Sequence, residues 1–572
     1  MLVGLVCLIV LVLAYQATRT ALALNQVKKD VATLGRQVRD GDADAAKVTL
    51  RELRGHAGTA HANSDNVLWS GISRLPWIGG DIRAVRVVAS SLDTSARRAL
   101  PVAVEIYDTV TRSKLRSDGG RFDTAAIAAL EPRFRRLSAG LAPAERELDG
   151  IEPDQLRLPT VRSATQDFQD QLSALVTLGR AGTTATEVLP GMLGADGPRT
   201  YLLVVQNNAE LRATGGLAGS LLTLRTNQGK LTLGKRSSAG DFLRVPAPVV
   251  RVTDEEKQLY GLGIAQDIRE ANETPDFPRV GQIINGFSRA TYGRQVDGVI
   301  AIDPIALASL LKATGPIKVG GESFTSENTV RKLLNTVYLR YTDPKVQDAY
   351  FAGVAKGIFD RLSSRPVNQL SVVRTLAQAV SERRFLVWSN KPAESRELRG
   401  TTITGALPTG TAGRTSAGMY LNDAASGKMQ YYLDHVGGIR PVSCTGDGTQ
   451  RFDVQLRLRS TAPADAASLP IYITGDGSNV AKGSMRMSLR IYGPVGGKIV
   501  GLEANGKKRD PYLFTADGRP VAFLFLTLKP QGRINIVARV ETPSGGRGRP
   551  ELAWTPGVRT GATSISAESA CG

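Results

Sequence analysis

The first residues of the chain form one apolar run. Leu2–Tyr15 contains no charged residue and is interrupted only by Gly4. A helix of that length reaches about 21 Å, whereas the hydrocarbon core of a bilayer is about 30 Å thick. To span a membrane, the helix must continue through Gln16–Leu24 and carry Arg19 near its end, where the long side chain can reach the interface.

Two interpretations of residues 1–24 follow. The sequence Ala21-Leu22-Ala23 has the small-residue form of a signal-peptide cleavage site. An uncleaved membrane anchor is favoured, because a helical pattern continues from Leu24 to Val38. We therefore expect a single-pass protein of the cell membrane whose bulk is extracytoplasmic.

Residues 25–195 show the period of helices. Val27, Val31, Leu34 and Val38 recur at spacings of four, three and four, which places them on one helix face. Further helices are predicted over Asp42–His56, Asp81–Val110, Asp123–Leu148 and Val161–Val188, with a turn at Leu75–Gly80. Such a helical extracytoplasmic region is typical of a spacer or a docking bundle.

Residues 196–425 alternate between strand and helix patterns. A strand at Tyr201–Val205 and a hairpin around Thr226–Gly229 precede a helix that starts near Thr253 with a capping box to Glu256. The remaining predicted elements are the hairpin strands Ser220–Arg225 and Lys230–Gly234, the strand Val296–Ile302, a helix capped by Asp303, and helices over Ser326–Tyr338 and Val346–Leu362. This order predicts a mixed α/β layered domain.

Residues 426–572 contain strand-like runs separated by Gly, Pro and Asp turns. These runs are Gln430–Leu433, Phe452–Leu458, Met485–Tyr492, Val521–Leu528 and Ile534–Thr542. Their spacing predicts an antiparallel β-sandwich. The expected fold class is thus multidomain α+β: an N-terminal membrane helix with a helical region, a central α/β domain and a C-terminal sandwich.

Cysteine and charge usage bound the environment. Of three cysteines, Cys7 lies in the apolar run, while Cys444 and Cys571 are expected to form a disulfide in an oxidising compartment rather than remain two unrelated thiols. Lys and Arg exceed Asp and Glu by 72 − 53 = 19 without forming a block. That excess indicates anionic partners such as lipid head groups or phosphate-bearing wall polymers, or simply a solvated surface. Nucleic acid is not expected, because no basic stripe is interleaved with aromatics.

Several catalytic motifs are absent from the sequence. No CxxC pair, G-x-S-x-G elbow or phosphate-binding P-loop occurs, and all three histidines lie outside residues 196–425. Catalysis in the α/β domain would therefore depend on Arg, Asp, Glu, Lys and backbone amides.

The segment Gln206–Ser220 is the densest candidate site. Its glycines, Gly215, Gly216 and Gly219, suit a backbone nest for an anion, and Arg212 offers a planar fork for phosphate oxygens. Asn207 and Ser220 are the candidate ligand-binding side chains at its two ends. The alternative is a tight turn that Asn207 caps and in which Glu210 pairs with Arg212.

Four further residues have both a functional and a structural interpretation. Asp241 and Arg244 lie three apart, and Asp276 stands between prolines, where turn chemistry is common. Arg340 ends a predicted helix, where a cation complements the dipole.

Together these segments resemble the family called domain of unknown function 4012. The matching pieces are Tyr201–Ser220, Asn272–Phe277, Val296–Pro304 and Leu311–Gly315. The resemblance implies an anchored, exported protein without an assigned activity, of a kind found chiefly in Gram-positive bacteria.

A fainter similarity reaches the LytR–CpsA–Psr core over Ala213–Arg244 and Val296–Leu362. Those enzymes transfer glycopolymers from a polyprenyl diphosphate lipid to peptidoglycan. The similarity implies catalytic roles for Arg212, Asp241, Arg244 and Arg340 in holding a diphosphate, with Asp241 as the candidate ligand of Mg²⁺. The chain departs from that family at Ala349–Phe351, where the expected arginines are missing.

Three functions remain open from the sequence. The leading hypothesis is a cell-envelope protein whose α/β domain binds an anionic glycan or a polyprenyl-linked precursor. The alternatives are a phosphoglycosyl transferase that attaches glycopolymers to the cell wall, and a non-catalytic envelope scaffold.

Overall fold

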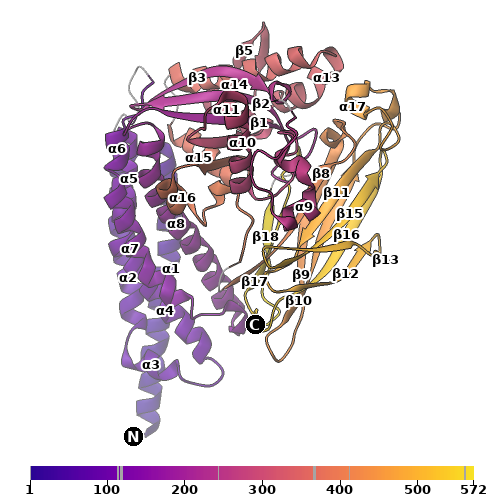
Figure 1. Cartoon of the computed structure of the whole chain (residues 1–572). Coiled ribbons are helices and arrows are strands. Elements are labelled where there is room, and N and C mark those ends of the chain that lie inside the picture. Colours follow the sequence, from indigo (N-terminus) through magenta and orange to yellow (C-terminus); the bar gives the residue numbers. More distant parts are fainter. Residues whose placement is uncertain are drawn as a thin grey trace. The chain divides into compact units, whose positions relative to one another are not determined.

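The structure, a computed structural model, describes residues 2–112, 115, 120–242, 244–364, 369–410, 413–559 and 562–571. The chain forms two compact units (Figure 1). The first comprises Met1–Ser117 and Phe122–Asp196, and the second comprises Asp118–Arg121 and Gly197–Gly572.

The regular elements of the first unit are helices. Its helices are α1 (Leu2–Asp40), α2 (Ala43–Ser64), α3 (Val67–Ile72), α4 (Gly79–Arg98), α5 (Leu100–Arg112), α6 (Thr124–Ala128), α7 (Glu131–Leu148) and α8 (Pro159–Met192), with a 3₁₀ turn at Pro153–Gln155. Neighbours pack in the order α1 on α2, α2 on α4, α4 on α7 and α7 on α8. Asp42 and Asp123 cap α2 and α6 through their carboxylates, as acids at these positions predict.

The predicted apolar face of the first helix is correct in part. Val27 and Leu34 are buried with Leu50 and Leu53 of α2, whereas Val31 is exposed. Across the part of the chain that the structure describes, no helix combines the length and the apolar character that crossing a bilayer demands.

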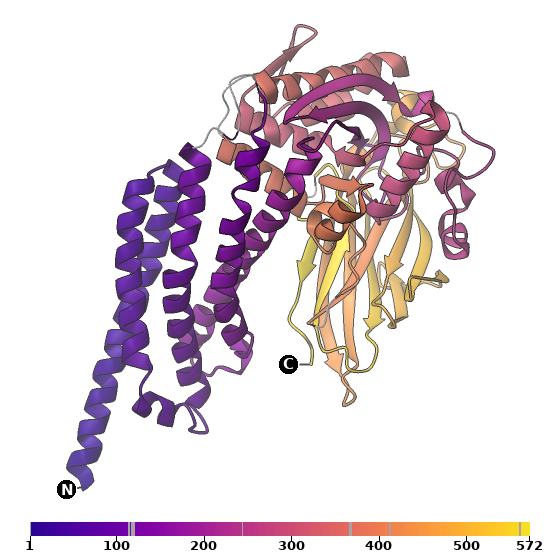
Figure 2. The same cartoon turned by 60° about the vertical axis from the view of Figure 1, so that its left-hand side comes forward.

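The second unit begins with a mixed five-stranded sheet. Its order is β3-β2-β1-β4-β7, with β1 parallel to β4 and every other pair antiparallel (Figure 2). The strands are β1 (Arg199–Asn207), β2 (Leu217–Asn227), β3 (Lys230–Ser238), β4 (Gly298–Ile302) and β7 (Phe385–Ser389), and a separate hairpin pairs β5 (Ile317–Val319) with β6 (Glu322–Phe324).

Helices cover both faces of this sheet. Helix α10 contacts β4 and β7 on one face, while α11, α14 and α15 contact β1, β2 and β7 on the other. The helices are α9 (Asp254–Tyr260), α10 (Phe277–Tyr292), α11 (Pro304–Thr314), α12 (Thr329–Arg331), α13 (Val337–Arg340), α14 (Pro344–Ser364), α15 (Gln369–Ser381) and α16 (Pro392–Leu398). The capping box of Thr253 with Glu256 and the cap of α11 by Asp303 are confirmed.

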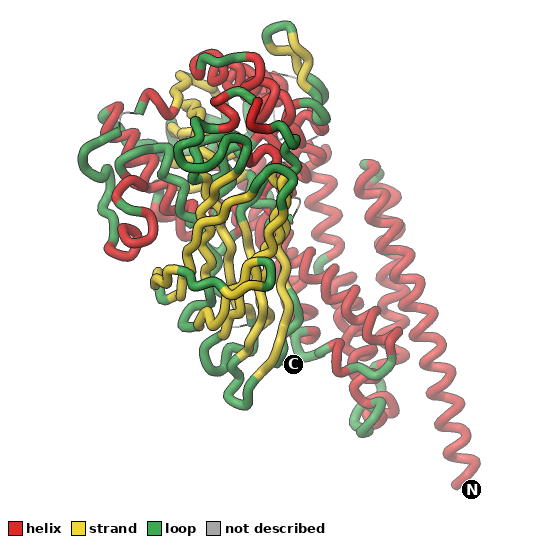
Figure 3. The backbone as a smooth tube through the Cα atoms, turned by 90° about the vertical axis from the view of Figure 1, so that its right-hand side faces the viewer, coloured by secondary structure: helices red, strands yellow, loops and turns green. Residues whose placement is uncertain are grey.

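The rest of the second unit is a two-sheet sandwich (Figure 3). One sheet has the order β13-β12-β16-β10-β9 and the other β14-β15-β11-β8-β17-β18. The elements are β8 (Arg414–Asp423), β9 (Leu433–Cys444), β10 (Gln450–Ser460), α17 (Ile471–Thr474), β11 (Met485–Tyr492), β12 (Lys498–Ala504), β13 (Lys507–Lys508), β14 (Tyr512–Ala516), β15 (Arg519–Leu528), β16 (Arg533–Glu541), β17 (Arg549–Trp554) and β18 (Ser564–Ser566).

Two predictions about the sandwich need correction. It is not purely antiparallel, because β17 runs parallel to β8. Residues 430–432 are not a strand, since Met429–Tyr432 forms a 3₁₀ turn that places Met429 and Gln430 in the interior, and β9 begins only at Leu433.

The sheet domain and the sandwich share one hydrophobic core. Ala209 and Leu211, after β1, belong to the same buried cluster as Met419 and Leu421 of β8. The backbone N–H of Asp423 donates to the carbonyl of Leu211 at 2.9 Å. Strand β8 therefore joins the sandwich to the α/β layers upstream of residue 426, where the sequence predicted the sandwich to begin.

Candidate functional site

The glycine-rich segment after β1 is buried. Residues 206–216 are all buried, and a Cβ on Gly216 would lie 2.2 Å from the carbonyl carbon of Asn207. Gly215 has φ +136°, and a Cβ there would meet the side-chain oxygen of Gln206 at 2.7 Å. These two glycines are required for close packing of the chain against itself.

The amides of this segment already have partners. The N–H groups of Gly215 and Leu217 donate to the carbonyls of Arg212 and Glu210 at 2.8 and 2.9 Å. The N–H of Ala213 donates to Asn422 Oδ1 of β8 at 2.8 Å. The sandwich and the segment itself therefore use these three donors, which an open anion nest would leave free.

Arg212 lies within a network of carboxylates. Its Nη2 atom is 3.5 Å from Glu210 Oε1 and 3.6 Å from Glu270 Oε1, and its side chain is only 5% exposed. Its Nε and Nη1 atoms donate to the carbonyls of Arg269 and Leu211 at 3.2 and 3.0 Å. Burial alone lowers the pKa of Arg212, but these carboxylates together raise it above its ordinary value. The alternative expected from the sequence, in which Glu210 pairs with Arg212, matches this arrangement.

A second buried cation balances Glu210. Lys428, which precedes the turn at Met429, forms an ion pair with Glu210, and both side chains are less than a tenth exposed. Burial raises the pKa of Glu210, yet Lys428 and then Arg212 hold it below its ordinary value. The ammonium group also lies 5.0 Å from the ring centroid of Tyr472. Charge is thus matched at the junction between the α/β layers and the sandwich.

The solvent side of this network contains an acidic pair. Glu270 is 37% exposed, and Glu273 is held by Arg490 of β11 at 3.4 Å. Burial, followed by hydrogen bonding to Glu273, raises the pKa of Glu270 to about 8. The raised pKa favours the protonated form of Glu270, which lowers the negative charge beside Arg212.

The carboxyl ends of the parallel strands are filled by protein. Ligands of open α/β sheets bind in the crevice at this edge. Here Asp303, which follows β4, accepts from Asn208 at 3.2 Å and from Arg384 at 2.6 Å. Arg384 in turn donates to the carbonyl of Gly557, which follows β17, at 2.9 Å. The sandwich therefore occupies the position where such a ligand would lie.

The other three predicted catalytic residues have partners that differ from those of Arg212. Asp241 Oδ2 accepts from the N–H of Ser238 in a capping box, and Arg244 is exposed. Arg340 pairs with Glu322 of β6 at 2.7 Å. Within the described ranges, no hydrogen bond or ion pair joins any two of these four residues. The shared cleft expected from the sequence is therefore not supported by their contacts.

Two of the predicted ligand-binding side chains, Asn207 and Asp276, have structural partners. Asn207 donates to the hydroxyl of Tyr338 at 2.6 Å, and Asp276 caps α10 while accepting from the N–H of Leu407 at 3.0 Å. Burial raises the pKa of Asp276. Gly219 has nothing closer than 3.9 Å to a Cβ position, and Ser220 is buried in β2.

A pocket of about 280 Å³ lies at the β2–β3 hairpin instead. It is lined by Arg121, Arg225, Thr226, Asn227, Gln228, Lys230 and Thr232. Arg225 pairs with Thr232 and Asn227 with Lys230 across the two strands, so these four side chains share one face of the hairpin. Gln228 and Gly229, with φ of 49° and 77°, form the tight turn that brings the two strands together.

This pocket, which we call the hairpin pocket, is lined by cationic and neutral polar side chains. Three of its seven lining residues are cationic and none is acidic. Arg225 and Lys230 make no ion pair with any described residue. Their charges are therefore available to an anion from solution.

Comparison with known proteins places the sheet region in a family. Residues 196–338 match DUF4012, a family of proteins of unknown function. No curated protein matches the chain.

Solved structures resemble the chain only distantly. A protein of Legionella pneumophila described as a candidate nutrient-binding protein is 10% identical, with a TM-score of 0.15, and the match covers 24% of this chain and 54% of that protein. The chain thus spans about half the length of that relative. The Lin1025 protein from Listeria innocua is 12% identical, with a TM-score of 0.20, and the match covers 45% of this chain and 90% of that one.

Sequence reasoning predicted the hairpin of the DUF4012 region but missed its pocket. The strand alternation that places Arg225, Asn227, Lys230 and Thr232 on one face could have been read from the predicted register. Single cations on a hairpin are common, however, and Arg121 comes from a distant part of the chain.

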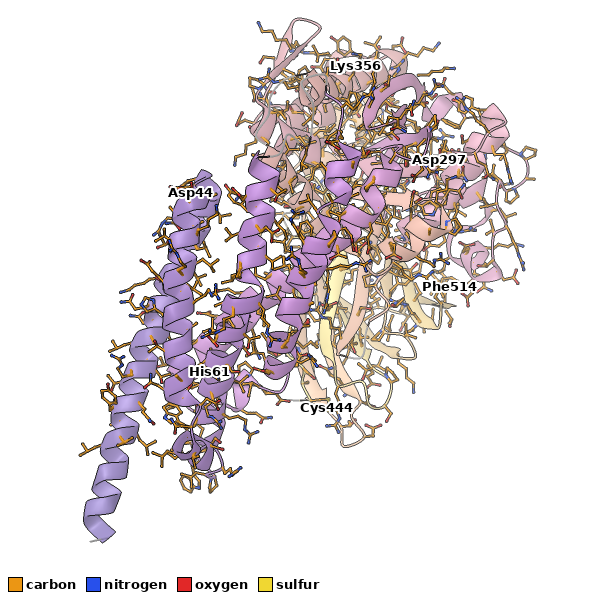
Figure 4. All side chains as sticks on the ribbon, turned by 90° about the vertical axis from the view of Figure 1, so that its left-hand side faces the viewer. Asp44, His61, Asp297, Lys356, Cys444 and Phe514 are labelled. Atoms are coloured by element: carbon orange, nitrogen blue, oxygen red, sulfur yellow. A yellow bond between two sulfur atoms is a disulfide. The ribbon has the colours of Figure 1, made fainter. Side chains whose placement is uncertain are left out.

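Two further expectations concern covalent and metal chemistry. Cys444 and Cys571 form a disulfide (Cys444 is labelled in Figure 4). Among the described residues, no group of three or more His, Cys, Asp or Glu side chains is arranged to hold a metal ion. Asp241, the candidate Mg²⁺ ligand, takes part in the capping box with Ser238.

Proposed function

We propose that this chain is an extracytoplasmic envelope protein that binds a phosphate-bearing glycan or lipid-linked precursor without catalysing its transfer. The observation that carries the proposal is the hairpin pocket, in which Arg225 and Lys230 have no counter-charge among the described residues. Guanidinium and ammonium groups are the usual partners of phosphate oxygens.

The size of the pocket limits what enters it. A volume of about 280 Å³ is at the lower end of ordinary small-molecule sites. One phosphate with an adjoining sugar or glycerol unit suits this space, so a polymer would be held one unit at a time. Thr232, Asn227 and the backbone of the turn supply neutral hydrogen-bonding groups for hydroxyls.

The contacts of the Arg212 guanidinium favour binding without catalytic turnover. Stabilisation of a transition state requires charge that is preorganised and available. The guanidinium of Arg212 is shared between the carboxyl groups of Glu210 and Glu270 and two backbone carbonyls. The transferase alternative would need Arg212 to release these partners.

The scaffold alternative is favoured by a different observation. The α/β layers and the sandwich share one core, which makes the second unit a rigid body suited to holding other proteins. This alternative predicts that removing charge from the hairpin pocket has no effect on ligand binding.

The test compares two double variants of the full chain. Arg225→Gln with Lys230→Gln removes the unpaired charges of the pocket. Arg457→Gln with Arg459→Gln removes two exposed arginines from β10 and serves as the matched control. Affinity for poly(glycerol phosphate) should fall at least about tenfold in the first variant and by less than about twofold in the second, since only the first removes charges that face the ligand.

Three outcomes decide between the functions. Equal affinity of wild type for poly(glycerol phosphate) and for a neutral glycan would contradict the proposal, and equal affinity in both double variants would favour the scaffold. Phosphoglycosyl transfer that disappears in Arg244→Ala while the fold survives would favour the transferase. Arg244 is the more informative position for that assay, because it is exposed and its loss should leave the fold intact.

A further inference from the structure

The start of strand β14 is exposed on both of its faces. Tyr512 is 69% exposed and Leu513 is 63% exposed. Adjacent residues of a strand point to opposite faces of the sheet, and in a sandwich one of those faces is normally buried. Since both side chains are exposed, the first residues of β14 project beyond the sandwich core.

The projecting residues continue into an aromatic row. The rings of Tyr512 and Phe523 lie 6.2 Å apart, and those of Phe523 and Phe525 lie 5.1 Å apart. Phe525 is itself 50% exposed. Large apolar side chains that gather on a surface mark an interaction site more often than scattered ones do.

Basic residues immediately precede this row. Lys507 and Lys508 form β13, and Arg509 follows; all three are exposed. Asp510 lies 3.7 Å from Lys508, with both side chains more than four-fifths exposed, and Glu503 of β12 stands opposite Lys508 across the strand pair. Three cations thus stand beside these two acids. The local charge is therefore positive.

We infer that this tip, formed by Lys507–Leu513 with Phe525, docks on the surface of an anionic lipid bilayer. Aromatic and aliphatic side chains beside Lys and Arg are the combination by which peripheral proteins bind such surfaces, with the apolar groups at the acyl boundary and the cations among the head groups. Tyr512 suits the boundary itself, because its ring is apolar and its hydroxyl is polar. This site is separate from the hairpin pocket and goes beyond the proposed function.

Two other occupants fit the tip less well. A sugar ring stacks on a flat, open aromatic face, but Phe523 and Phe525 stand at 80° to each other and Arg486 covers Phe525 at 4.7 Å. A peptide could add to β14 as a further strand, since β14 is the edge of its sheet. Helix α9 contacts β14, however, and Phe514 (labelled in Figure 4) packs against the buried cluster that contains Leu259 of α9, which leaves a short free edge.

The test must separate the tip from the apolar N-terminal run, which would itself bind membranes. A polarity-sensitive fluorophore is therefore placed at the tip of the full chain, as Leu513→Cys in a Cys7→Ser background with the Cys444–Cys571 disulfide intact. The control places the same label at Ile471→Cys, because Ile471 is 61% exposed elsewhere in the sandwich. Each protein is mixed with vesicles of phosphatidylcholine alone or with phosphatidylglycerol added.

The expected result is a blue shift of the label at residue 513 with phosphatidylglycerol vesicles only. Adding Lys507→Gln, Lys508→Gln and Arg509→Gln should abolish that shift, and the label at residue 471 should not respond. No shift with phosphatidylglycerol overturns the inference, as does an equal shift at residue 471 or a shift that survives the triple variant. A shift that grows with protein concentration without vesicles would instead identify a second copy of the chain as the occupant.

Discussion

The glycine-rich segment and the hairpin pocket both present arginine beside glycine, yet they differ in what neutralises the charge. Arg212 is 5% exposed and lies between Glu210 and Glu270, while Arg225 and Lys230 line a pocket without a carboxylate. A buried charge must be paired to be tolerated, so its presence reports on folding. A solvent-facing cation in a concave site does not need a protein partner for folding. A cation of this kind without a protein partner therefore indicates where an anionic ligand can bind.

Removal of the Lys428 ammonium group should have the largest effect on the stability of the protein. Lys428→Met leaves Glu210 buried with less compensation, and the free energy of unfolding should fall by about 3–5 kcal/mol in urea titrations. The double variant with Glu210→Gln should recover part of that loss, because a neutral amide then replaces the buried carboxylate that had lost its ammonium partner. A loss below about 1 kcal/mol in the single variant would show that the network does not hold the second unit together.

The glycines of the segment offer a matched pair of smaller changes. Gly216→Ala places a Cβ 2.2 Å from a backbone carbon and should cost about 2–3 kcal/mol of unfolding free energy. Gly219→Ala meets nothing closer than 3.9 Å and should change that energy by less than about 0.5 kcal/mol. If the two substitutions destabilised the protein equally, close packing would not be the reason for Gly216.

A third expected effect is a dependence of stability on pH. Burial raises the pKa of Glu270 from 4.5 to about 8 and that of Asp423 from 3.8 to about 6. Between the ordinary and the raised values the folded state binds more protons than the unfolded state, so the free energy of unfolding should decrease as pH rises from about 4 to about 8. The two carboxyl groups contribute their full stabilisation at pH values below their ordinary pKa values.

Glu270→Gln should flatten that decrease, since the amide stays neutral. Glu503→Gln, on the exposed surface of β12, is the control and should leave the slope unchanged. Denaturation midpoints measured across this pH range distinguish the two variants. An unaltered slope in Glu270→Gln would mean that the carboxyl of Glu270 is solvated like an ordinary surface acid.

Much of the local structure could be predicted because its causes are local. The capping box of Thr253 with Glu256 and the cap at Asp303 involve residues three apart. The β2–β3 hairpin follows from its turn and from alternation along two adjacent strands. The strand predicted at Gln430–Leu433 holds only for Leu433, because tertiary packing around Met429 and Gln430 outweighed a short apolar pattern.

The candidate site could not be predicted in the same way, because its partners are distant in sequence. Lys428 lies 218 residues from Glu210, and Asn422 lies 209 residues from Ala213. A glycine-rich loop has the same sequence whether its amides face a ligand or a second layer of protein. Only the position of β8 decides between the two, and that position follows from the shared core.

Hydrogen–deuterium exchange of the full chain, with and without poly(glycerol phosphate), tests the central claim most directly. The account predicts that the polymer slows amide exchange over residues 225–232 and leaves residues 206–220 unchanged. Slower exchange over residues 206–220, with no change over residues 225–232 in the bound protein, would contradict it.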